Sequence, residues 1–126
     1  MASLQSRISD LITAIGADIK KLRKVVSAAS AATLTPSGAE SQFVLTAQAA
    51  ALSIVNPIAG NMSDGQGILF RIKDNGTARA ISWGTNYRAI GVTLPTTTVI
   101  SKTLYVGAKW NAADTKFDVL AVGQEA

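Results

Sequence analysis

Apolar side chains recur every three or four residues along the start of the chain. They occupy Leu4, Ile8, Leu11, Ile15, Ile19, Leu22 and Val26. This spacing is typical of an amphipathic helix. Its mean step of about 3.67 residues lies near the eleven-residue repeat and predicts a straight or slightly right-handed bundle. Because several of these positions are β-branched, the pattern favours three or four helices over two. We therefore expect residues 1–27 to form an oligomerising, coiled-coil arm that acts as a stalk or anchor.

A surface helix folded against its own domain is the alternative for this segment. The stripe is more regular than a single docked helix requires, which favours the oligomeric arm. The following tract SAASAATLTPSG is small and polar and contains a proline. Such composition is typical of a linker, which we place at residues 28–38.

Beyond the linker the pattern changes to short β-rich runs separated by turn signals. The expected strands are 43–47, 51–55, 67–73, 78–83, 89–94, 103–110 and 117–122. In the third strand, alternation places Ile68, Phe70 and Ile72 on one face and Leu69, Arg71 and Lys73 on the other. The pattern predicts a mainly β protein in which residues 39–126 form a small antiparallel β-sandwich or jelly-roll-like knob.

The strongest turn signal is Asp74-Asn75-Gly76, because a two-residue type I′ turn needs positive φ at both central positions. A hairpin closed by this turn would place Phe70 opposite Ile81 and Ile68 opposite Trp83. The alternative three-residue loop would face Arg71 toward Arg79, an unfavourable like-charge pair. The first register is therefore expected.

The charge is concentrated on the arm rather than on the knob. The net charge is +4; residues 1–27 carry five bases against two acids (+3), and the remainder carries seven against six (+1). Cations near the C-terminal end of a helix interact favourably with its dipole. This role explains the basic residues of the arm without any contact to nucleic acid. No binding motif or aromatic residue accompanies them, so nucleic-acid binding is not expected. No apolar run is long enough to cross a membrane, and membrane insertion is not expected.

Candidate chemistry is sparse, and no cofactor or metal is expected. The chain has no cysteine and no histidine, which excludes Cys/His zinc sites and His-based triads. The knob's carboxylates are few, and Asp74 and Asp114 fall in turns where Asp serves the local backbone. A glycan-cleaving enzyme would need two acids on opposite sides of a cleft. Asp64 and Asp118 are the candidate pair, and we do not expect them to act in this way. We expect no catalytic residue and no enzymatic activity.

Three residues around the 84–88 loop are candidate contacts for a ligand or receptor. Trp83, Tyr87 and Arg88 combine aromatic rings with a guanidinium, a composition enriched at interaction hot spots. The alternative is that Trp83 closes the hairpin core and Tyr87 packs at a boundary between protomers. Both interpretations remain open at the level of sequence.

Residues 33–126 resemble a C-terminal β-module of tailed-phage structural proteins. The resemblance rests on DGQGILFRIKDNGTARAISWGTNYRAIGVTLPTTTV and on KTLYVGAKWNAADTKFDVLAVGQE, where Phe117 stands at a position that is usually Trp. It implies a homotrimeric knob on the exterior of the capsid or tail of a virion, made in the host cytoplasm. With so short an arm we expect a short fibre or decoration protein whose partner is a capsid or tail protein. A receptor-binding fibre tip that engages a host-surface glycan or protein is the alternative.

Overall fold

The computed structural model describes residues 3–21 and 24–126. In those residues one long helix, α1 (Leu4–Lys21), precedes a mainly β region. Its strands are β1 (Lys24–Ala28), β2 (Thr33–Leu34), β3 (Glu40–Gln48), β4 (Leu52–Ile54), β5 (Gly67–Asp74), β6 (Ile81–Trp83), β7 (Tyr87–Ala89), β8 (Leu104–Asn111) and β9 (Lys116–Gln124), with a 3-10 turn at Ala59–Asn61. The predicted mainly β fold with one N-terminal helix is confirmed.

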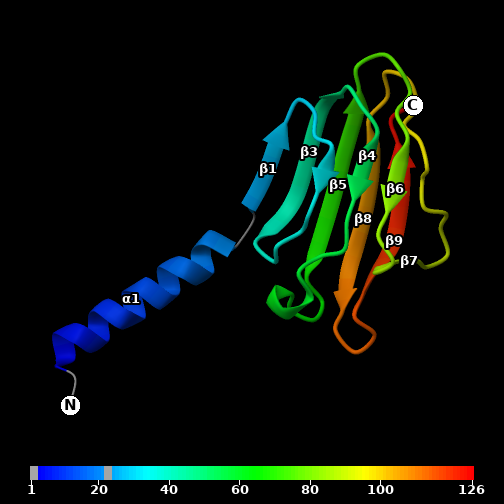
Figure 1. Ribbon diagram of the computed structural model, residues 1–126. Coiled ribbons are helices and arrows are strands. Elements are labelled where there is room, and N and C mark those ends of the chain that lie inside the picture. The colour runs from blue at the N-terminus through cyan, green and yellow to red at the C-terminus, as the bar shows by residue number, and fades with distance from the viewer. Residues whose placement is uncertain (1–2, 22–23) are drawn as a thin grey trace.

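The strands form two sheets, and the chain passes back and forth between them (Figure 1). The six-stranded sheet has the order β1-β3-β5-β8-β9-β7, and the three-stranded sheet has the order β2-β4-β6. From β1 to β6 successive strands alternate between the sheets, so each strand pairs in parallel with the strand two further along. Among the strands described, antiparallel pairing joins β5 to β8 and β8 to β9. The larger sheet is therefore mixed, and the predicted antiparallel pairing of the knob is wrong.

One hydrophobic core lies between the facing sides of the two sheets. The three-stranded sheet contributes Leu52, Ile54 and Ile81, and β5 contributes the predicted inward face, Ile68, Phe70 and Ile72. Phe70 is fully buried; its ring stacks on Phe43 at 5.7 Å and meets the edge of Trp83 at 5.5 Å. The alternation in β5 therefore predicted the correct buried face.

The hairpin predicted at Asp74-Asn75-Gly76 is not formed. The turn instead carries the chain to the other sheet, where β6 pairs in parallel with β4, so that Trp83 lies opposite Ile54. The antiparallel partner of β5 is β8, with Phe70 opposite Val106 and Ile68 opposite Ala108. Because β3 and β8 occupy both edges of β5, no edge is left for a return strand.

The arm also ends earlier than predicted. α1 ends at Lys21, and β1 lies at the edge of the six-stranded sheet, paired with β3. Val26, predicted for the helical stripe, instead packs against the core. The run Val25-Val26 favours a strand once a neighbouring strand offers hydrogen bonds. The β region thus begins at Lys24, and the predicted linker 28–38 contains β2.

Candidate interaction surfaces

The apolar stripe of α1 is exposed to solvent. Figure 1 shows the helix extending away from the β region. Leu4 is 74% exposed and Ile12 is 64% exposed, and Ile8, Leu11 and Ile15 are also exposed. The predicted stripe residue Ile19 lies in α1 with its side chain outside the described part, and Leu22 lies outside the described residues. A soluble helix rarely leaves such a stripe uncovered, so this surface is the leading candidate contact site.

The ring of Tyr87 is buried in the core, and Trp83 is partly buried and packs against that core. The Trp83 indole nitrogen donates a hydrogen bond to the carbonyl oxygen of Pro95 at 2.8 Å. Tyr87 is buried, its ring stacks on Phe117 at 5.7 Å, and its hydroxyl donates to the carbonyl oxygen of Val55 at 2.9 Å. Burial raises the pKa of the Tyr87 phenol, which keeps it protonated. This placement favours packing as the role of both rings.

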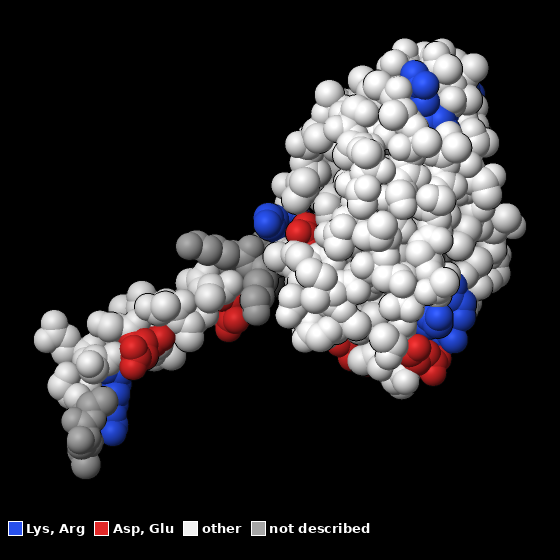
Figure 2. Space-filling view, in the orientation of Figure 1, with Lys and Arg blue, Asp and Glu red and all other residues white. Residues whose placement is uncertain are grey.

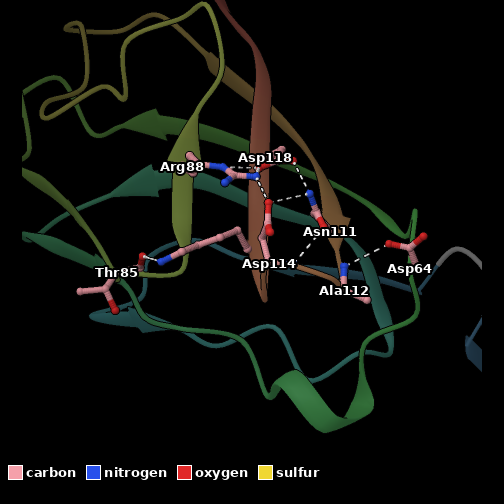
Figure 3. A network of polar contacts seen from close by, with 8 residues as sticks. Asp64, Thr85, Arg88, Asn111, Ala112, Asp114 and Asp118 are labelled. Carbon is pink, nitrogen blue, oxygen red and sulfur yellow. Dashed lines mark hydrogen bonds and ion pairs between the residues drawn. The ribbon is translucent and has the colours of Figure 1, made fainter.

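Arg88 holds together the end of the molecule drawn in Figure 3. Its Nε donates to Asp118 at 2.8 Å and one terminal nitrogen donates to Asp114 at 3.0 Å. Asn111 donates to both carboxylates at 3.3 Å. The hydrogen bonds from Arg88 to Asp114 and Asp118 raise the pKa of the guanidinium. The structure therefore brings the rings of Trp83 and Tyr87 together at 5.2 Å, whereas Arg88 pairs with Asp114 and Asp118 on the outer side of the sheet.

The same end of the molecule is closed by further contacts to the backbone. Lys116 Nζ donates to the carbonyl oxygen of Thr85 at 2.7 Å, and Asp64 accepts from the amide of Ala112 at 3.0 Å. These bonds tie the β8–β9 turn to the loops beside it (Figure 3). The arrangement braces a cluster of loops, in which Asp64, Asp114 and Asp118 all accept hydrogen bonds.

A second surface was not singled out by sequence reasoning, namely the outer face of the six-stranded sheet. The residues Val25, Gln42, Leu69, Gly107 and Ala121 form a row across five strands, because each is the register partner of the next. Arg71, Lys73 and Lys109 alternate onto this face with Tyr105. The alternation of β5 indicated the outward basic residues, but only strand order shows that β8 lies beside them.

Among the described residues, no three acidic, His or Cys side chains come close enough to hold a metal ion. No helix in the described part of the chain is both long and apolar enough to span a membrane. Comparison with protein-family models, curated protein sequences and solved structures found no match to this chain.

Proposed function

We propose that the protein is a short trimeric fibre or decoration protein of a tailed-phage virion. In this proposal α1 associates with its copies and attaches to a capsid or tail protein, and the β knobs face outward. The protein acts by assembly and has no catalytic turnover. The observation that carries the proposal is the uncovered apolar stripe of α1.

The stripe needs a partner for energetic reasons. A helix of 18 residues standing alone in water is of marginal stability. Burying each large aliphatic side chain contributes about 1.5–3 kcal/mol, so association that covers the stripe would stabilise the helix itself. A second copy supplies a stripe of matching length and spacing, which makes self-association the simplest way to cover it.

The width of the stripe favours more than two helices. Ile8 and Ile15 lie one above the other, and Ile12 extends the apolar surface to one side of them. In a two-helix coil each helix has a single contact seam. A broader stripe lets each helix contact two neighbours, as in a parallel trimer. The trimer state is therefore the oligomer that we propose.

The virion location is supported by the sequence resemblance of residues 33–126 to tailed-phage structural modules. A β region joined to a projecting helix is the shape expected of an anchored fibre or decoration protein (Figure 1). The receptor-binding alternative is not favoured at Tyr87, whose ring is buried, or at Trp83, whose partly buried ring packs on the core and donates a hydrogen bond to Pro95. A glycan-cleaving activity is not favoured, because Arg88 pairs with both Asp114 and Asp118.

The oligomeric arm is tested by the double substitution Ile8→Asp with Ile15→Asp. Two charges in an apolar seam cannot be buried without a large desolvation cost. The wild-type protein should have the mass of a trimer by light scattering, and the variant should have the mass of a monomer. Its β-sheet circular dichroism should be unchanged.

The matched control is Gln5→Asp with Ser9→Asp, which adds the same charge on exposed positions of α1 beside the stripe. It should remain a trimer. A monomeric wild-type protein over a wide range of concentrations would contradict the proposal. Immunogold labelling of intact particles would separately test the virion location.

A further inference from the structure

The two faces of the β region differ in charge. Figure 2 shows the face over β4 and β6, and most of its area is free of charged side chains. That face carries the small hydroxyl row Thr33, Ser53 and Ser82, which are register partners across the three-stranded sheet. The outer face of the six-stranded sheet is different, because its outward positions include Arg71, Lys73, Lys109 and Arg88 against the acids Asp118 and Glu125.

Both acids on the outer face are already paired. Glu125 lies 3.8 Å from Lys73, and Asp118 lies 2.7 Å from Arg88. Lys109 is opposite Asp118 in the strand register, but the Asp118 carboxylate binds Arg88 instead. Within the described residues, neither Arg71 nor Lys109 forms an ion pair. Two cations on this face are therefore available to an anion from outside.

An exposed ring and a glycine lie near these two cations. Tyr105 is 40% exposed and lies opposite Arg71, while Gly107 lies between Tyr105 and Lys109 on β8. The missing side chain at Gly107 leaves room beside Leu69. Tyr105 and Lys109 are four residue steps apart along the strand, a length of about 13 Å. An extended chain lying along β8 could contact the ring and both cations at once.

We propose that this outer face, centred on Arg71, Tyr105 and Lys109, binds an anionic polysaccharide. The cations pair with carboxylate or sulfate groups, and the exposed tyrosine ring packs on a sugar face between them. Nucleic acid fits less well, because its dense phosphates are bound by many cations, on the order of 6–10 contacts. The face offers few free cations, spaced for a polymer of lower charge density.

The proposal goes beyond the virion assembly described above and does not depend on it. Uncharged surface is easier to bury between protomers than charged surface, so the basic face is the one suited to remain exposed. If the knobs form a trimer, three such faces on one particle would strengthen binding by avidity. A monomeric protein would still bind the polysaccharide, with lower apparent affinity.

Binding of the full chain to chondroitin sulfate and hyaluronan, both less densely charged than DNA, tests the proposal, with neutral dextran and a DNA duplex for comparison. The wild-type protein should bind both acidic polysaccharides at low salt, more weakly as sodium chloride increases, and should not bind dextran. Arg71→Ser with Lys109→Ser should weaken binding at least about tenfold. Tyr105→Ala should weaken it with the charge unchanged.

Two further variants separate a specific face from general charge. Gly107→Glu adds a carboxylate between the cations, and its Cβ would meet only Ala121 Cβ at 3.9 Å and Leu69 Cδ1 at 4.0 Å, both ordinary contacts; it should abolish binding while the fold is kept. The matched control, Arg7→Ser with Lys24→Ser, removes two exposed cations from α1 and from the start of β1. It should bind as the wild type does.

Several results would overturn the proposal. One is the absence of binding to both acidic polysaccharides at low salt, and another is equal loss of binding in the matched control. Tighter binding to the DNA duplex than to the polysaccharides would assign the face to nucleic acid. A change in the oligomeric mass of the Arg71→Ser with Lys109→Ser variant would show that this face is instead a contact between copies of the chain. Circular dichroism of each variant distinguishes a loss of polysaccharide binding from a loss of folded structure.

Discussion

Two polar side chains are buried where the chain turns from the six-stranded sheet to the other. Gln48 and Asp74 are register partners on β3 and β5, and both lie inside the protein. The Gln48 side-chain amide donates hydrogen bonds to the carbonyl oxygens of Ala31 and Ala50 and accepts one from the backbone amide of Ala31. The Asp74 carboxylate accepts hydrogen bonds from the Thr98 hydroxyl at 2.8 Å and from the backbone amides of Ser101 and Gly76. Each side chain thus supplies hydrogen bonds to backbone groups of the nearby turns, in place of water.

At this residue scale we expect Asp74→Ala to be strongly destabilising. The substitution leaves the Thr98 hydroxyl and two backbone amides without their acceptor, at a cost of about 1–3 kcal/mol. Urea unfolding would measure the loss. The control Asp64→Ala removes an exposed carboxylate that accepts one backbone hydrogen bond and should cost less. Equal losses in the two variants would contradict the role of Asp74.

The same carboxylate predicts how stability depends on pH. Burial raises the pKa of Asp74, but hydrogen bonds from Ser101, Thr98 and Gly76 outweigh burial and leave the pKa below its usual value. The folded state therefore binds this proton less readily than the unfolded state. The stabilisation is complete above the ordinary Asp pKa of about 4 and is lost as the pH falls through the lowered pKa. Acid should narrow the difference between wild type and Asp74→Ala, a trend that urea titrations between neutral and strongly acidic pH would show.

At the scale of elements, the loop after β6 depends on a close approach of two backbone segments. A Cβ atom at Gly84 would lie 2.7 Å from the backbone nitrogen of Asn56 and would also collide with the Asn56 side chain. That side chain accepts a hydrogen bond from the amide of Asn86 at 2.8 Å and donates to Thr85. The contact fixes where the chain leaves β6 and enters β7, which positions Tyr87 and Arg88.

Gly84→Ala should therefore displace this loop and destabilise the protein by about 1–3 kcal/mol. Thermal unfolding would measure the change. Gly123→Ala is the control within β9, because a Cβ there would meet nothing within 4 Å, and we expect little change in its unfolding temperature. A neutral Gly84→Ala would show that the loop can shift without loss of packing.

At the scale of the whole molecule, the helix and the β region are separate in their packing. The residues of the core and those packed against it all lie between 26 and 122. α1 extends away from them (Figure 1). The knob should accordingly fold without the arm, and the arm should matter for association.

A protein lacking residues 1–21 tests this separation. We expect it to keep its β-sheet circular dichroism and to be monomeric by light scattering. Its unfolding temperature should be independent of protein concentration, whereas that of the full chain should rise with concentration, since association stabilises the folded state. Loss of folded structure in the shortened protein would contradict the separation.

The sequence alone determined features that depend on local periodicity. The three-to-four-residue spacing of Leu4, Ile8 and Leu11 defined the helix, and alternation defined the buried face of β5, because each pattern follows from the geometry of a single element. The stalk, the trimer and the virion location stay predictions.

Only the tertiary structure decided which elements meet. The Asp74-Asn75-Gly76 signal marked a turn correctly but could not show that the chain crosses to another sheet there. Val26 fits a helical stripe, yet the open edge of β3 made it part of a strand, since pairing and burial override weak local preference. Contacts between distant strands likewise bury Tyr87 in the core and pack the partly buried Trp83 against it. The basic face with Arg71 and Lys109 exists only because strand order sets β5 beside β8, and strand order depends on contacts between residues far apart in sequence.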